Sequence, residues 1–155
     1  MTFNLAVDRS TFVTHLGCSL TGERYAADEQ HGLSAAGRPL LVRYDLGAVG
    51  KALSRDALAA RPTDLWRWRE LLPVRRTESI VSLGEIETPL IPIPRSAAPN
   101  VIVKDEGRLP TGSFKARGAA VGVTRAGELG VTTLALPTAG NAGAAWAAYL
   151  SLIHI

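Results

Sequence analysis

The pattern of apolar residues from position 100 onward alternates between short runs and longer periodic segments. The elements that it predicts are, in order, a buried strand at residues 101–103, a helix over residues 113–129 closed by Gly130, a second buried strand at 132–136, a tight turn at 137–140 and a helix that begins at Asn141. Continuous apolar strands that alternate with helices are typical of parallel strands in an α/β fold.

Before position 100, the apolar pattern is interrupted more often by glycine and proline. Residues 1–46 consist of short segments separated by glycines, and residues 40–44 give the clearest strand. Asp64 is a candidate N-cap for a short helix through Leu71, which Pro73 would stop. Residues 79–99 are rich in proline, so we expect them to be extended or looped.

Composition describes an ordinary globular chain. Of its 155 residues, 46% are hydrophobic and 20% are charged, which is enough apolar material for one core. The net charge of +3 is spread along the sequence, which argues against a nucleic-acid partner. A single cysteine, Cys18, excludes an internal disulfide framework. No stretch is long and apolar enough to span a membrane and no signal peptide is visible, so a cytoplasmic location is expected.

Lys115 is the first candidate for chemistry. The chain has only three lysines among 17 basic residues, and this one follows a Pro-Thr-Gly-Ser turn at the start of the predicted helix. A lysine amine can lose its proton and attack a carbonyl, whereas arginine cannot. Thr111 and Ser113 are placed to bond the first free N–H groups of that helix. Taken alone, the tripeptide at 113–115 indicates a surface lysine after a helix cap.

Longer flanking sequence identifies a family. Three blocks occur in order between Arg69 and Tyr149: ELLP, SLGE and TPL at 70–90, KDEGRLPTGSFKARG at 104–118, and PTAGNAG at 137–143. Together they resemble the pyridoxal-phosphate (PLP) enzymes of the tryptophan-synthase β family, and among them the threonine synthases. The resemblance implies a two-domain parallel-sheet fold (fold type II), of which this chain carries an incomplete part.

The resemblance also implies roles for residues. Lys115 would bind PLP as a Schiff base and then move protons, Phe114 would flank the cofactor, Asn141 would hydrogen-bond the 3′-oxygen of the pyridine ring, and Thr138, Ala139 and Gly140 would offer donors to the substrate carboxylate. A turn that opens a helix is in any case a suitable anion site. Without the resemblance, Asn141 reads as an ordinary N-cap.

The implied reaction converts O-phosphohomoserine and water to threonine and phosphate. The partner is then a small amino-acid substrate, the complete enzyme would be a lyase and could be a homodimer, and no nucleic acid or membrane is involved. Threonine dehydratase and the cysteine-synthase-like β-replacement enzymes share the lysine and asparagine motifs and remain alternatives. A remote alternative is a non-catalytic basic module.

The N-terminal segment resembles a zinc ribbon that has lost its ligands. A four-thiolate site needs two cysteine pairs. Here the four positions read Cys18, Thr21, Leu33 and Ala36, so we expect no metal and an apolar replacement of the site. Arg75 and Arg76, further along, read as a solvated pair.

We expect three parts in the chain. Residues 1–46 form the degenerate ribbon-like segment and residues 47–149 form the N-terminal part of a PLP-dependent domain. Residues 150–155 break the compositional bias of the chain, and the codons CTG TCT CTT ATA CAC ATC, the end of a transposon adapter used in sequencing libraries, encode them in order. We therefore expect a non-native tail, and an isolated chain that is poorly folded and inactive.

Overall fold

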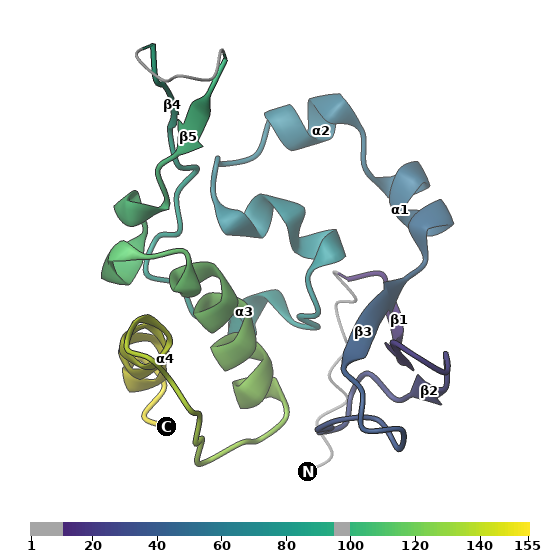
Figure 1. Ribbon diagram of the computed structural model, residues 1–155. Coiled ribbons are helices and arrows are strands. Elements are labelled where there is room, and N and C mark those ends of the chain that lie inside the picture. The colour runs from purple at the N-terminus through teal and green to yellow at the C-terminus, as the bar shows by residue number, and fades with distance from the viewer. Residues whose placement is uncertain (1–10, 95–99) are drawn as a thin grey trace.

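The computed structural model describes residues 11–94 and 100–155. Its strands are β1 (Val13–Cys18), β2 (Arg24–Tyr25), β3 (Leu40–Tyr44), β4 (Leu90–Pro92) and β5 (Ile102–Lys104). Its α-helices are α1 (Leu46–Ala52), α2 (Arg55–Ala59), α3 (Lys115–Glu128) and α4 (Asn141–Ser151) (Figure 1). Short 3-10 helices occur at η1 (Leu65–Leu71), η2 (Thr77–Ser79), η3 (Glu106–Arg108) and η4 (Pro110–Gly112). None of the helices in the described ranges is long and apolar enough to cross a bilayer.

The N-terminal part is a small antiparallel sheet in the order β2-β1-β3. The strand predicted at residues 40–44 is confirmed as β3, which pairs along β1 with Cys18 opposite Leu40. After this sheet the chain runs through α1 and α2 to η1. Asp64 caps η1 as predicted, because its carboxylate accepts a hydrogen bond from the Arg67 N–H at 3.1 Å.

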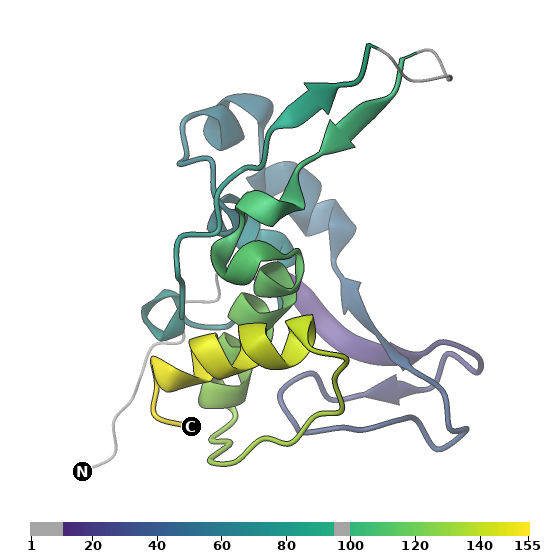
Figure 2. The same ribbon diagram turned by 60° about the vertical axis from the view of Figure 1, so that its left-hand side comes forward.

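A hairpin of β4 and β5 projects from the rest of the molecule (Figure 2). The predicted strand near 101–103 is therefore present, but its partner is the antiparallel β4, with Ile91 opposite Val103. Its predicted burial is wrong, since Ile102 is 57% exposed and Leu90 is 64% exposed. Apolar residues on both faces of a strand predict neighbours on both faces, and the described residues do not supply them.

The predicted strand at 132–136 is also not formed. This segment runs without regular structure, and its two threonines and Ala135 are exposed. A parallel strand exists only where a neighbouring strand offers it a ladder of hydrogen bonds. All strand pairs among the described residues are antiparallel, so the expected parallel α/β sheet is wrong for this part of the chain. What is observed is a mixed α/β architecture with two small sheets.

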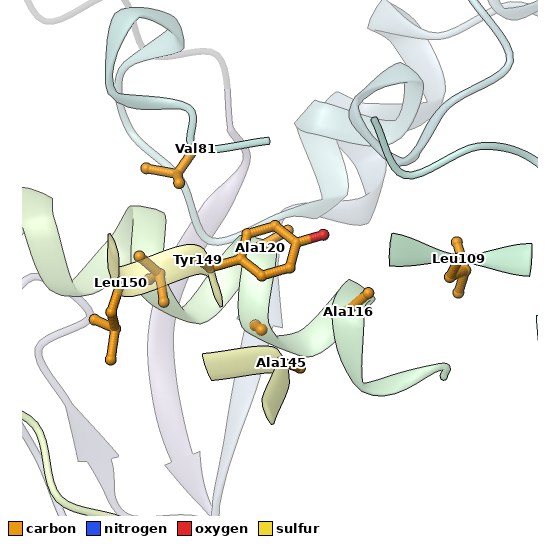
Figure 3. Packing of buried hydrophobic residues seen from close by; sticks show 9 residues of the cluster. Val81, Leu109, Ala116, Ala120, Ala145, Tyr149 and Leu150 are labelled. Carbon is orange, nitrogen blue, oxygen red and sulfur yellow. The ribbon is translucent and has the colours of Figure 1, made fainter. Parts of the chain in front are cut away.

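The core lies where α4 packs across α3 (Figure 3). Both helices are confirmed close to their predicted bounds, and Gly130 ends the α3 turn at a φ of 71°. The contact surface consists mainly of small residues, which let the two helices approach closely: Ala116, Ala119, Ala120, Val123 and Ala145 are all fully buried. Gly122 faces Trp146 so closely that an added Cβ would lie 2.5 Å from the ring.

A buried carboxylate joins α4 to the segment that precedes the hairpin. Glu85 is fully buried and accepts hydrogen bonds from the Tyr149 hydroxyl, the Ser82 hydroxyl at 2.7 Å and the Trp66 indole N–H at 3.2 Å. Burial raises the pKa of Glu85, but the hydrogen bonds from Tyr149, Ser82 and the Leu83 N–H together lower it below its usual value. Burial, followed by the bond to Glu85, raises the pKa of Tyr149. Tyr149 therefore remains a neutral phenol that donates its proton in a hydrogen bond to the ionised Glu85 carboxylate.

Candidate functional site

The turn that leads into α3 has an unusual backbone. Thr111 and Gly112 are both left-handed, at φ values of 63° and 69°, and the turn lies between η3 and the helix. Glycine adopts such values readily, whereas threonine does so rarely. The sequence Pro-Thr-Gly-Ser therefore produces a tight reversal that places Lys115 as the first residue of α3.

The Lys115 amine lies over the neighbouring aromatic ring. Its Nζ atom is 4.4 Å from the centroid of the Phe114 ring, within the range of a cation–π contact. Phe114 is 57% exposed, and Lys115 is half-buried. The predicted pair is thus brought together, with an open ring face and a reachable amine at the same helix end.

Ser113 does not cap this helix, contrary to expectation. Phe114 occupies the N-cap position and no side chain accepts a hydrogen bond from the first turn. The Ser113 hydroxyl oxygen is instead buried and has no partner among the described residues. A buried polar atom without a partner is costly. This hydroxyl is therefore a group that could bond to something placed beside Lys115.

The asparagine loop opens α4. Asn141 is the first residue of the helix and is exposed, but the N-cap is Gly140, with a φ of 125°. The interpretation of Asn141 as an ordinary N-cap is therefore wrong. The Thr138 hydroxyl oxygen accepts hydrogen bonds from the N–H groups of Gly140 at 3.0 Å and Gly143 at 2.8 Å. Thr138 thus holds the loop in shape, and its hydroxyl proton remains available to donate.

The two motifs lie in one region without touching through polar groups. Helix α4 packs on α3 and on η4, the turn that precedes Lys115. Among the described residues no hydrogen bond or ion pair links Lys115 to residues 138–141.

Sequence reasoning missed the polar cluster around Glu106. This carboxylate accepts two hydrogen bonds from the Arg117 guanidinium, at 2.9 and 3.1 Å, and one from the Thr88 hydroxyl at 2.6 Å. The bonds from Arg117 and then Thr88 lower the pKa of Glu106 to about 2, although desolvation opposes the shift. An acid and an arginine on either side of the lysine turn were the available signal.

The N-terminal segment contains one thiol. Cys18 is buried, and its Sγ lies 3.1 Å from the Ser34 hydroxyl and 3.4 Å from the Thr21 N–H. Hydrogen bonds with Ser34 and Thr21 lower the pKa of Cys18 to about 6. Leu33 is 66% exposed, so the predicted apolar replacement is wrong: a polar residue, Ser34, faces the cysteine. In the described parts of the chain, no three His, Cys, Asp or Glu residues gather as a metal site would require.

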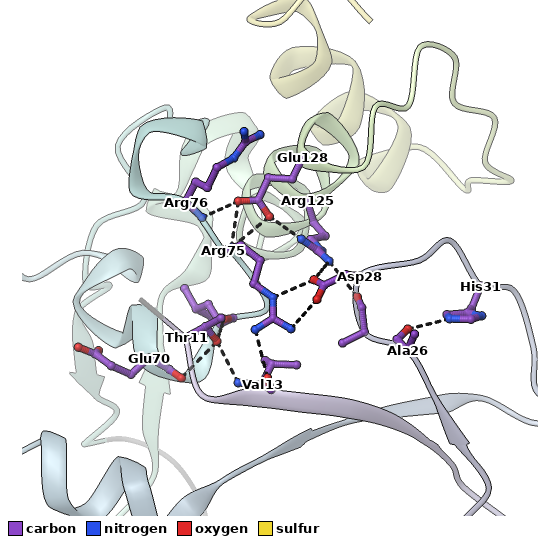
Figure 4. A network of polar contacts seen from close by, with 12 residues as sticks. Thr11, Val13, Ala26, Asp28, His31, Glu70, Arg75, Arg76, Arg125 and Glu128 are labelled. Atoms are coloured by element: carbon purple, nitrogen blue, oxygen red, sulfur yellow. Dashed lines mark hydrogen bonds and ion pairs between the residues drawn. The ribbon is translucent and has the colours of Figure 1, made fainter. Parts of the chain in front are cut away.

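Arg75 is not solvated as expected but lies in a network that joins the N-terminal sheet to α3 (Figure 4). It donates to both oxygens of Asp28, at 2.8 and 3.1 Å. Arg125 of α3 donates to the same carboxylate at 2.6 Å, and Glu128 accepts the Arg75 and Arg76 backbone N–H groups. Helix α3, which begins at Lys115, is therefore bonded to the N-terminal segment of the chain.

Comparison with known proteins assigns a class to this arrangement. Residues 81–155 match the sequence model of a family described as pyridoxal-phosphate dependent enzymes. This part of the chain, which is similar to that family, carries both the Lys115 turn and the asparagine loop. No solved structure matches the chain.

The particular relatives are threonine synthases. The chain is 40% identical over 136 residues to the threonine synthase of Methanocaldococcus jannaschii, covering 85% of this chain and 34% of the relative. It is 39% identical over 140 residues to that of Methanosarcina acetivorans, covering 87% and 34%. A third, from Halalkalibacterium halodurans, is 42% identical over 88 residues, covering 55% and 25%. The chain thus spans about a third of the length of the relatives it matches over most of its sequence.

The residues present fit PLP. A reachable amine can bond the aldehyde, the exposed Phe114 ring offers an aromatic face, and the Ser113 hydroxyl lacks a partner among the described residues. Gly140, with its φ of 125°, has no side chain at the residue that directly precedes α4. These are groups that an aromatic aldehyde beside Lys115 would use.

Proposed function

We propose that this protein is a threonine synthase, which converts O-phosphohomoserine and water to threonine and phosphate with PLP as cofactor. The observation that carries the proposal is the position of Lys115, at the first residue of α3 with its amine beside the Phe114 ring. The names of the relatives supply the reaction. When bound, PLP supplies an electron sink that stabilises negative charge on the substrate carbons.

Lys115 holds the cofactor and moves the protons in this proposal. Its amine lies at the end of a short, fixed turn, so it can reach one face of a bound substrate repeatedly. Phe114 shields one side of the site from water.

The asparagine loop orients the ring and the substrate. Asn141 is exposed at the start of α4, where its side-chain amide can donate to an oxygen on the pyridine ring. Thr138, Ala139 and Gly140 lie at the N-terminal end of the same helix and are exposed. A helix N-terminus favours negative charge, so this loop is suited to the substrate carboxylate.

The division of the chain is part of the same proposal. Residues 1–46 form a ribbon-like module without metal, residues 47–149 contribute to a larger domain of fold type II, and residues 150–155 are a non-native tail. The complete enzyme works in the cytoplasm and forms a homodimer. Sequencing the coding DNA past Tyr149 tests the tail: a genomic stop codon after Ile155 would rule it out.

The function is tested on the product of the complete gene. The assay measures phosphate released from O-phosphohomoserine, with wild type, Lys115→Ala and Lys51→Ala. Lys51 is an exposed residue of α1 and serves as the matched control. We expect Lys115→Ala to lower the rate by roughly a thousandfold, because proton transfer and covalent attachment are both lost, and Lys51→Ala to leave it unchanged.

Two results would overturn the proposal. If Lys115→Ala kept the wild-type rate, the lysine would not be the reacting group. If wild type left O-phosphohomoserine intact but deaminated threonine, or replaced a β-substituent of a serine derivative, the protein would be one of the other enzymes that share these motifs.

A further inference from the structure

The turn that carries Lys115 is held within its own sequence by backbone hydrogen bonds, from the Gly112 N–H to the Leu109 carbonyl at 2.9 Å and from the Ala116 N–H to the Ser113 carbonyl at 3.2 Å, and not by side chains of its own. No side chain caps the first turn of α3, the Ser113 hydroxyl has no partner among the described residues, and two consecutive residues are left-handed. The amine itself has its contact with Phe114, a neighbour on the same turn. Side-chain bonds that orient the turn must therefore come from residues outside it.

A bidentate ion pair supplies those bonds. Arg117, two residues after Lys115, donates from Nε to one oxygen of Glu106 at 2.9 Å and from a terminal nitrogen to the other at 3.1 Å. Glu106 precedes the turn and Arg117 follows it, so the pair closes the loop at both of its ends. Parallel bonds between a guanidinium and a carboxylate fix orientation as well as distance.

The pair is itself fixed to a third segment. The Thr88 hydroxyl donates to Glu106 at 2.6 Å, and Lys104 lies 3.5 Å from the same oxygen. Thr88 is 2% exposed, while the side chains of Glu106 and Arg117 are 23% and 27% exposed. A partly buried pair with a buried third member is far more rigid than an exposed surface pair.

We propose that Glu106 is a positioning residue: its carboxylate, gripped by Arg117 and Thr88, sets the direction in which Lys115 presents its amine to the cofactor. This inference rests on the proposed function, because it takes PLP as the group that Lys115 meets. Glu106 touches neither cofactor nor substrate, and its contribution is the geometry of the turn.

A second ion pair of the same kind offers a matched control. Arg61 donates to both oxygens of Glu70, at 2.8 and 2.7 Å, and their side chains are 22% and 11% exposed. This pair joins the segment after α2 to η1 and does not bracket the lysine turn. Glu70→Gln should therefore cost stability as Glu106→Gln does, without moving Lys115.

The test measures how fast Lys115 captures PLP. The complete gene product is stripped of cofactor with hydroxylamine and mixed with PLP, and samples are reduced with borohydride at intervals. Peptide mapping then gives the labelling of Lys115 relative to exposed Lys51. The variants are Glu106→Gln, Arg117→Gln, Glu106→Asp and the control Glu70→Gln, and thermal melts ensure that each is folded at the assay temperature.

We expect the Lys115-to-Lys51 ratio to fall about tenfold in Glu106→Gln and in Arg117→Gln, since a misplaced reacting group loses much of its rate. Glu106→Asp, which keeps the carboxylate, should recover part of it, and Glu70→Gln should keep the wild-type ratio. If both folded Gln variants kept that ratio, or if Glu70→Gln lowered it equally, the positioning role would be wrong. If one Gln variant is unfolded, the other decides. Failure of wild type to label Lys115 would instead overturn the proposed function.

Discussion

The packing of Trp146 against Gly122 predicts opposite effects on stability for substitutions at two glycines of α3. Gly118 and Gly122 lie in the same helix, one turn apart. A Cβ added at Gly118 would meet nothing within 4 Å. A Cβ added at Gly122 would lie 2.5 Å from Cη2 and 2.8 Å from Cζ2 of Trp146. The same substitution to alanine therefore tests packing with helix propensity held constant.

The magnitudes decide the sign at each position. Alanine is better than glycine inside a helix by about 0.5–1 kcal/mol, and this gain applies to both sites. At Gly122 the new methyl group must displace an indole ring held between the two helices, and overpacking of this kind costs about 1–3 kcal/mol. We expect Gly118→Ala to raise the free energy of unfolding by about 0.5–1 kcal/mol and Gly122→Ala to lower it by about 1 kcal/mol.

The assay is urea unfolding of the complete gene product, followed by circular dichroism and by tryptophan fluorescence, with both variants compared with wild type. A double variant, Gly122→Ala with Trp146→Leu, makes room for the methyl group and should recover part of the loss. If Gly122→Ala proved as stable as Gly118→Ala, the close approach of α3 and α4 at this point would be wrong.

Three further outcomes are expected. Tyr149→Phe removes a buried donor to the Glu85 carboxylate and should lower the free energy of unfolding by about 2 kcal/mol in urea melts, whereas an unchanged midpoint would show that the bond contributes nothing. The pKa of Glu106 is lowered from 4.5 to about 2, so its contribution of about 1–2 kcal/mol, after allowance for solvent, is complete above pH 4.5 and is lost as the pH falls toward 2. The stability difference between wild type and Glu106→Gln should shrink over that range, and a constant difference would contradict the low pKa. The isolated 155-residue chain should neither melt cooperatively nor bind PLP, because its hairpin leaves large apolar residues exposed, and a sharp melt with a cofactor absorbance band would refute this.

Sequence patterns correctly predicted the helices and caps that depend on residues close together in the chain. The periodicity of residues 113–129, the closing Gly130 and the cap at Asp64 each depend on neighbours a few positions away, and all are found. The strand predicted at residues 132–136 was wrong because a strand depends on residues far away in the sequence. A run of apolar residues indicates that a segment prefers to be buried. A strand also needs a neighbouring strand with which to form hydrogen bonds, and none of the described strands pairs with this segment.

In the candidate site, too, residues within short motifs could be predicted from the sequence, whereas contacts between distant segments could not. Lys115, Phe114 and the loop before Asn141 lie within short motifs, so the sequence located them and the helix starts that present them. The sequence shows Glu106 and Arg117 on either side of the lysine turn but does not show that they meet, because residues eleven positions apart come together only after the turn between them reverses the chain. The contact between Glu85 and Tyr149 likewise depends on where α4 crosses α3.

Helix α3 is anchored at both ends by arginines that grip carboxylates. Near its start Arg117 holds Glu106, and in its last turn Arg125 holds Asp28 of the N-terminal module, about 12 Å further along the helix axis. Charged hydrogen bonds from Arg75 and Arg125 to Asp28 join this part of the chain to the helix. Two anchors on one short helix restrict both its tilt and its rotation. Because Lys115 is the first residue of that helix, both anchors act on the direction of its amine.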